Sequence, residues 1–217
     1  MRKIKQIAII MFLMLSIQPM ILAMASDDRA EDIIKKAKNK YDKIKTLKAD
    51  FVQTFHWKLA DNIHQQKGTV WLKGKDQFKI QTADQVVVCN GRTLWTYSDF
   101  NKQVIIDHVD KSREVTLPRD IFMVYSEQYR PYYVGVEKID GEECSVLELV
   151  GKSEDQFIKQ MKIWIHSKLL LPIKIEQLDL NNNENRYVLS NIELDIPLAA
   201  NLFEYQPPAG VEVIDMR

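Results

Sequence analysis

From residue 48 onward, the chain is a succession of short segments in which apolar and polar residues alternate, separated by turn residues. Alternation with a period of two is typical of β-strands that bury one face, and about ten such segments follow one another. Because most connections between them are too short for a helical crossover, neighbouring strands are expected to run antiparallel. The pattern predicts one highly curved antiparallel sheet or an open barrel.

Two hairpins carry the clearest turn signals. Asn90-Gly91 separates two apolar runs and suits a type I′ turn, which needs positive φ. Asp140-Gly141 marks a second hairpin within residues 132–150. Further strands are expected over residues 157–166, 171–180 and 185–196.

One amphipathic helix is predicted ahead of the strands, within residues 27–47. Asp28 and Glu31 resemble a capping box at its start. The helix either packs on the sheet that follows, which is the favoured interpretation, or lies on a membrane surface. Its apolar side chains recur at helical spacing, and they are Ile33, Ile34, Ala37, Tyr41, Ile44 and Leu47.

The first 25 residues have the pattern of a cleaved signal peptide. Arg2, Lys3 and Lys5 precede an apolar run over residues 7–17, and residues 23–25 form a small-x-small cleavage site. The run is shorter than the roughly 20 residues of a membrane span, which favours cleavage over an uncleaved anchor. We therefore predict a protein exported to the periplasm, with residues 26–217 forming a single domain.

Charge and cysteine content exclude two classes of protein. The chain has 30 basic and 30 acidic residues, and removal of the leader leaves a net charge of about −3, without a basic stripe for nucleic acid. With only Cys89 and Cys144, the fold cannot depend on a disulfide framework. Export leaves a single bridge between these two cysteines open.

The sequence contains no motif that carries catalysis. His108, with Asp107 and Asp110, is the one local cluster of acids with an imidazole, and a surface position at a strand end explains it. Metal-ligand spacing, a nucleophile elbow, a CxxC pair and a phosphate-binding glycine loop are all missing from the sequence. We predict a protein that is not an enzyme, the alternative being catalytic residues that converge from distant strands.

The segment KADFVQTFHW, residues 48–57, places Gln53 on the same strand face as Phe51, Phe55 and Trp57. A filled core would exclude an amide or pair it, whereas a cavity with a wet rim tolerates one. The sequence therefore favours a hollow barrel with a lipid-type cavity, although a barrel filled by side chains stays open. The side chains expected on the concave face are Phe51, Phe55, Val70, Leu72, Phe78, Ile80, Val104, Ile106, Met161, Ile163, Ile173 and Ile175.

Residues 116–129, TLPRDIFMVYSEQY, interrupt the succession of strands. Pro118 suits the first turn of a helix, and Ile121 and Phe122 make the segment apolar. We predict a short, mobile helix that serves as a plug or lid for the cavity.

Four short motifs in series resemble the periplasmic outer-membrane lipoprotein carrier family, the LolA family. They are ADFVQTF directly after the opening helix, GTVWLKGKDQF, CNGRTLWTYSDFNKQV, and FEYQPPAGVEVID at the end. Each motif is weak alone, but their order and spacing are specific and span nearly all of the chain after the leader.

The resemblance implies a mainly β (α+β) fold, in which a single curved antiparallel sheet forms an unclosed β-barrel of about 10–11 strands with an N-terminal helix and a short lid helix. It also implies a monomer whose hydrophobic cavity receives the acyl chains of lipoproteins, without cofactor or metal. The implied partners are an inner-membrane lipoprotein-releasing ABC transporter and an outer-membrane acceptor lipoprotein. The residues assigned to the acyl cavity and lid are Phe51, Phe55, Val70, Leu72, Phe78, Ile80, Pro118, Ile121 and Phe122.

One position departs from the family pattern. Gly74 stands where the family commonly has an arginine that latches the lid. Closure is therefore expected to depend on apolar lid contacts, with Lys75 as the alternative latch. A carrier or sensor of another lipid or glycolipid is the alternative function, and a purely structural periplasmic barrel is a third.

Overall fold

The structure is a computed structural model that describes residues 27–109 and 128–217. The predicted signal peptide lies outside these residues. So do Pro118, Ile121 and Phe122 of the predicted lid, while Tyr129, which that prediction included, is the first residue of a strand.

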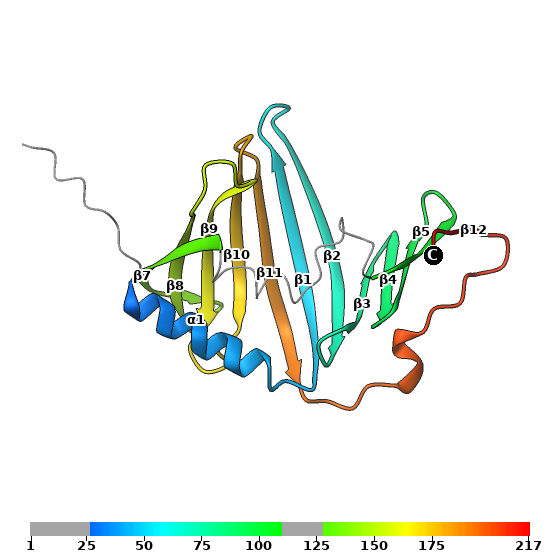
Figure 1. The fold of residues 1–217 in the computed structure, drawn as a ribbon, viewed down its shortest axis with the longest axis horizontal. Coiled ribbons are helices and arrows are strands. Elements are labelled where there is room, and N and C mark those ends of the chain that lie inside the picture. The colour runs from blue at the N-terminus through cyan, green and yellow to red at the C-terminus, as the bar shows by residue number, and fades with distance from the viewer. Residues whose placement is uncertain (1–26, 110–127) are drawn as a thin grey trace, which may run out of the picture.

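One twelve-stranded sheet makes up most of the molecule (Figure 1). Its strand order is β12-β6-β5-β4-β3-β2-β1-β11-β10-β9-β8-β7, so the sheet curves but does not close, with β12 and β7 as its two edges. The predicted unclosed sheet with one N-terminal helix is confirmed, and the strand count is higher by one or two. The elements are α1 (Asp28–Tyr41), β1 (Thr46–Trp57), β2 (Asn62–Lys73), β3 (Gln77–Thr82), β4 (Gln85–Asn90), β5 (Thr93–Ser98), β6 (Gln103–His108), β7 (Tyr129–Ile139), β8 (Glu142–Gly151), β9 (Ile158–His166), β10 (Pro172–Asp179), β11 (Glu184–Leu194), the 3₁₀ turn η1 (Ala200–Phe203) and β12 (Glu212–Asp215).

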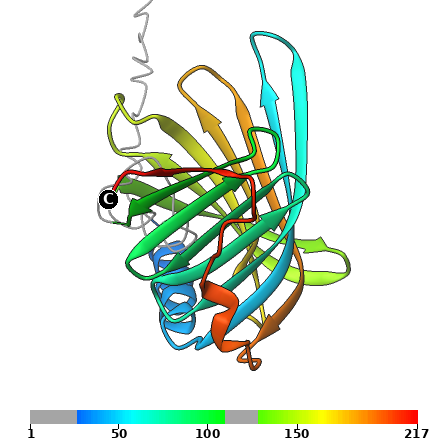
Figure 2. The same cartoon turned by 90° about the vertical axis from the view of Figure 1, so that its right-hand side faces the viewer.

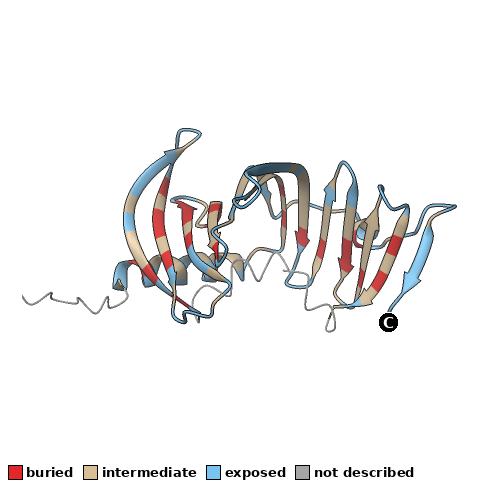
Figure 3. Ribbon diagram, turned by 90° about the horizontal axis from the view of Figure 1, so that it is seen from above, coloured by how far each residue is buried: buried red, intermediate tan, exposed pale blue. Residues whose placement is uncertain are grey.

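All pairings among β1 to β11 in the sheet order are antiparallel, as short connections require. The added strand β12 is different, because it pairs parallel with β6 after the long connection over residues 195–211. Figure 3 shows buried positions on all other strands except β11, whose residues are intermediate or exposed, whereas β12 is exposed along its whole length.

The helix α1 packs on the concave face of the sheet, beside β7 to β10 (Figure 1). Ile33, Ile34 and Ala37 contact a buried cluster that includes Leu147, Leu149, Met161, Ile163 and Ile175. The predicted packing role of the helix is therefore confirmed. The predicted cap is one residue too late, because Asp27 is the N-cap and its Oδ1 accepts a hydrogen bond from the Arg29 backbone N–H at 2.9 Å.

The two predicted hairpin turns differ in conformation. Asp140 (φ 50°) and Gly141 (φ 85°) both have positive φ, as a type I′ turn requires. At the other turn only Gly91 (φ 95°) has positive φ, and the Asn90 side chain instead accepts hydrogen bonds from the backbone N–H groups of Arg92 and Thr93. The type I′ prediction for Asn90-Gly91 is therefore wrong, because Asn90 uses its side chain to stabilise the turn.

The C-terminal segment crosses the convex face of β3 to β6 (Figure 2). Phe203 is buried there, and the Tyr205 ring stacks on the Tyr97 ring with their centroids 6.2 Å apart. Val104 pairs with Tyr97 across the sheet, so Val104 and Ile106 face the convex side. The prediction that placed these two residues on the concave face is wrong.

The two cysteines are free and buried. Cys89 packs in the concave core around Leu47 and Phe78, whereas Cys144 packs with Trp164 in a different cluster. A bridge between them is therefore not formed. Within the described residues, no helix is long and apolar enough to cross a membrane.

Candidate functional site

A cavity of about 270 Å³ opens on the concave face of the sheet, over the contiguous strands β4, β3, β2, β1, β11 and β10. Its floor and walls are apolar, and uncharged polar side chains complete its lining. The apolar lining residues are Leu47, Phe51, Val70, Leu72, Ile80, Val87, Pro172, Ile173, Ile175 and Leu189, and the polar ones are Gln53, Gln66, Thr82, Gln85 and Tyr187. A lining of this kind suits an aliphatic ligand.

Phe51 lies against the cavity because its partner on β2 is a glycine. Phe51 pairs with Gly68, and a Cβ atom at residue 68 would lie 2.8 Å from the Phe51 ring and 2.3 Å from the Gln81 carbonyl oxygen. Both distances are too short for any side chain, so only glycine allows the ring and the β2–β3 pairing to coexist. Gly68 of the KGTVW motif therefore shapes the cavity wall, because its lack of a side chain leaves room for the Phe51 ring.

Gln53, the amide among the aromatic residues, is paired with two groups on β11. Its Nε2 donates to Asn185 Oδ1 at 3.1 Å and to the Tyr187 hydroxyl at 3.2 Å. Asn185 Nδ2 also donates to the Tyr187 hydroxyl, at 2.8 Å. Burial raises the pKa of the Tyr187 phenol, which keeps it neutral and available as a hydrogen-bond donor.

The polar lining forms a collar at one end of the cavity, which we define as Gln53, Gln66, Thr82, Gln85 and Tyr187. Gln66 Nε2 donates to Thr82 Oγ1 at 3.3 Å, which links β2 to β3. The collar lies toward the end of the sheet that carries the β1–β2 turn, and the apolar floor lies toward the other end. A ligand with an aliphatic tail and an uncharged polar head would find matching chemistry along this axis.

The predicted cavity residues on described strands fall into two groups. Phe51, Val70, Leu72 and Ile80 line the cavity together. The other two, Phe55 and Phe78, lie on the same sheet face but outside the lining.

Phe55 lies beyond the collar, opposite His64 and Asn185, and is half-buried. Phe78 is buried in the core with Leu47 and Leu72, at the closed end. Sequence reasoning missed Tyr187 and Leu189, which alternate on β11 within the run NRYVL and could have been found from that alternation.

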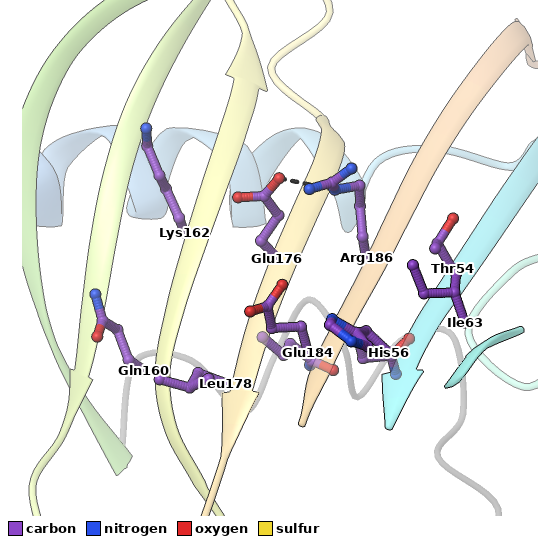
Figure 4. Close-up of a pocket in the computed structure, with 11 residues that line it drawn as sticks. Thr54, His56, Ile63, Gln160, Lys162, Glu176, Leu178, Glu184 and Arg186 are labelled. Atoms are coloured by element: carbon purple, nitrogen blue, oxygen red, sulfur yellow. Dashed lines mark hydrogen bonds and ion pairs between the residues drawn. The ribbon is translucent and has the colours of Figure 1, made fainter. Parts of the chain in front are cut away.

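A second hollow, of about 360 Å³, lies on the convex face (Figure 4). Its lining combines charged residues with Ile63 and Leu178, and Arg186 Nε lies 2.9 Å from Glu176 Oε1. Beside it, Trp164 Nε1 donates to Glu137 at 2.8 Å, and this bond together with Lys162 lowers the pKa of the Glu137 carboxyl. An aliphatic chain bound here would remove water from these charged groups, which costs free energy, so this hollow suits an aliphatic ligand less well than the concave cavity does.

Gly74 and Lys75 occupy the turn between β2 and β3. Gly74 has φ 59°, which favours glycine, and its N–H donates to the Lys45 carbonyl at 2.9 Å. Lys75 Nζ lies 3.7 Å from Asp42 Oδ1, at the end of α1. Within the described residues, no group of three His, Cys, Asp or Glu side chains could hold a metal ion.

Comparisons with known proteins find similarity over most of the chain. Residues 42–206 match the family of the outer membrane lipoprotein carrier protein LolA. An outer-membrane lipoprotein carrier protein from Pasteurella multocida is 28% identical over 193 residues, which cover 86% of this chain and 88% of that carrier. An uncharacterized protein from Methanocaldococcus jannaschii is 24% identical over 193 residues, and the match covers 85% of this chain but only 53% of that protein's length.

A solved structure shares the fold. The crystal structure of an uncharacterized conserved protein from Thermus thermophilus superposes with a TM-score of 0.59, over 86% of this chain and 99% of that chain. The two sequences are 13% identical, so this likeness shows the fold alone.

Proposed function

The chain belongs to the LolA family of outer membrane lipoprotein carrier proteins, and on that premise we propose that it binds the acyl chains of lipoproteins in its concave cavity. The observation that carries the proposal is the cavity itself, with apolar walls, an uncharged collar and no charged side chain among the described residues that line it. Burial of an acyl chain contributes about 0.8 kcal/mol per methylene group, so a chain is held without any specific polar contact.

The size of the cavity bears on how cargo enters. Its volume of about 270 Å³ is slightly below the range of about 300–1,000 Å³ that is common for small-molecule sites. The empty cavity must therefore widen to take several acyl chains. An unclosed sheet can widen because its edge strands β12 and β7 are not hydrogen-bonded to one another.

The carrier would move its cargo from the inner to the outer membrane across the periplasm, to which the predicted leader directs it. An inner-membrane ABC transporter would supply the lipoprotein, and an outer-membrane acceptor would receive it. The part of the predicted lid that precedes β7 would close the cavity through Ile121 and Phe122. This transport role involves no catalysis, metal or cofactor.

Photo-crosslinking tests the cavity assignment. A photoreactive residue at Phe51 or Ile80, which line the cavity, should crosslink to the lipid part of a lipoprotein. The matched controls are Val52 and Lys79, the adjacent positions whose side chains lie on the other face of the same two strands. Equal labelling at all four positions would contradict the cavity assignment.

Mass spectrometry of the crosslinked or co-purified lipid identifies the cargo class. We expect the triacylated cysteine of a lipoprotein. A glycolipid or a free phospholipid as the dominant species would favour the alternative carrier function while leaving the cavity assignment intact.

A further inference from the structure

The hairpin between β1 and β2 ends in an exposed apolar tip, which we define as residues 57–63. Trp57 is 50% exposed, Leu59 is 89% exposed and Ile63 is 64% exposed. In Figure 1 this hairpin projects furthest from the sheet, at the top of the view. By contrast, the turns at residues 74–76, 90–92, 140–141 and 167–170, at the other end of the described sheet, carry no large exposed apolar side chain.

The tip presents apolar groups in all directions. Trp57 lies on the concave face, in line with Phe51 and Phe55. Ile63 pairs with His56 and therefore lies on the opposite face, while Leu59 lies in the turn itself. A protein partner covers one face of a hairpin, whereas a lipid layer surrounds the whole tip, so this arrangement fits a lipid layer better.

Each of the two charged residues of the tip lies close to a polar partner, so neither is an isolated charge. Lys58 Nζ lies 3.4 Å from Glu184, and Asp61 lies 3.1 Å from His56 Nε2. The Lys58 backbone N–H also donates to Asn183 Oδ1 at 3.0 Å, which ties the tip to the β10–β11 turn. This hydrogen bond holds the tip in place, and the net charge of the tip is zero because it has one positive and one negative side chain.

Exposed apolar residues continue along the same end of the sheet, where Phe100 on the β5–β6 turn is 91% exposed. Phe157 is 62% exposed and Leu180 is 38% exposed, and the Leu180 backbone N–H donates to the Phe157 carbonyl at 2.9 Å. They stand at the β8–β9 and β10–β11 connections, next to the strands that brace the tip. The apolar character therefore extends along this end of the sheet.

We propose that the tip of the β1–β2 hairpin inserts into the surface of a phospholipid bilayer. Trp57 suits the interface between headgroups and acyl chains, and Leu59 would enter the apolar layer. Along β1, Phe55 lies between the collar at Gln53 and the tip at Trp57. The docked tip would bring the collar end of the cavity toward the membrane, where an acyl chain leaves or enters water.

Membrane docking by the tip is separate from acyl-chain binding in the cavity, and it can be measured on protein without cargo. The probe is vesicles of phosphatidylethanolamine and phosphatidylglycerol in equal amounts, with binding measured by co-sedimentation. Leu59→Asp should lower the vesicle-bound fraction about tenfold, since a charge replaces the most exposed apolar side chain of the tip. Met216→Asp is the control, because Met216 is 58% exposed and follows β12 at the opposite end of the sheet, and it should leave binding unchanged.

A spectroscopic measurement locates the contact. The chain has four tryptophans, so quenching by brominated lipid should be present in the wild-type protein and lost in Trp57→Phe, which keeps an apolar ring at the tip. Failure of the wild-type protein to bind vesicles, or equal loss of binding in Leu59→Asp and Met216→Asp, would overturn the proposal. Acyl-chain crosslinking at Phe51 should persist in Leu59→Asp, which separates this proposal from the cavity assignment.

Discussion

Replacement of Gly68 by alanine tests how the cavity wall is built. The new Cβ atom would lie 2.3 Å from the Gln81 carbonyl oxygen and 2.8 Å from the Phe51 ring. The carbonyl belongs to the β2–β3 pairing and cannot rotate away as a side chain could, so either that pairing or the ring must move. Overpacking of this kind costs about 1–3 kcal/mol of the free energy of unfolding.

Thermal unfolding measures this cost. For a domain of this size, about 2 kcal/mol corresponds to a fall in Tm of about 4–8 °C. Gly151→Ala is the matched control, because its Cβ would meet Gln156 Oε1 at 2.6 Å, the end of a flexible side chain. The control should cost at most about 1 kcal/mol, the worth of the exposed hydrogen bond from Gln156 to Gln128 that it displaces.

The same substitution should weaken ligand binding. If the Phe51 ring moves away from residue 68, it moves into the cavity and reduces the space for an acyl chain. Binding of a fluorescent fatty acid should therefore weaken in Gly68→Ala and recover partly in Gly68→Ala with Phe51→Leu, whose side chain is smaller. An unchanged Tm together with unchanged fatty-acid binding would refute the reasoning that glycine is required under the ring.

Three further predictions follow from packing, electrostatics and backbone conformation. Phe203→Ala should lower the free energy of unfolding by about 3–5 kcal/mol, because it empties a buried site under the C-terminal segment, as chemical denaturation would measure. The hydrogen bond from the Trp164 indole N–H lowers the pKa of Glu137 in the folded protein. Its carboxylate therefore stabilises the fold fully at pH values above the unfolded pKa of about 4.3. This stabilisation is lost as the pH falls through the lower folded pKa. The difference in stability between wild type and Glu137→Gln should thus be present at neutral pH and absent in acid. Gly74→Arg should destabilise the fold by about 1–2 kcal/mol, because residue 74 has positive φ. Lys75→Ala should change the free energy of unfolding by at most about 1 kcal/mol, because its ion pair with Asp42 is exposed. A loss of cargo transfer in folded Lys75→Ala would identify Lys75 as a latch.

Part of the candidate cavity could be predicted from local pattern alone. Ile80 alternates with the polar residues Lys79 and Gln81, and Phe51 has the same two-residue spacing from Phe55 and Trp57, which places each set of side chains on one face of its strand. The pattern does not say how far along the strand the cavity extends. Phe78 and Phe55 share the face of Phe51, but one lies in the closed core and the other lies beyond the collar.

The face of a strand is ambiguous where apolar residues are consecutive. In β6, Val104, Ile105 and Ile106 follow one another, so the sequence cannot tell which of them faces inward. The cross-strand pairs with Tyr97 and Trp95 decide it, since paired residues in an antiparallel ladder share a face. The C-terminal segment, which is distant in the sequence, then covers the convex side of β6 and buries Val104 and Ile106.

The sequence by itself determined most of the strands, most turn positions, the amphipathic helix and the antiparallel pairing of strands joined by short turns, because each depends on residues close together in the chain. Only the tertiary structure decided that Gln53 pairs with Tyr187, that Phe51 lies on Gly68, and that β12 joins β6 in parallel. These features depend on register and curvature, which bring together residues that are far apart in the sequence. The cavity exists because six strands curve around one space, and no single segment of the sequence records that curvature.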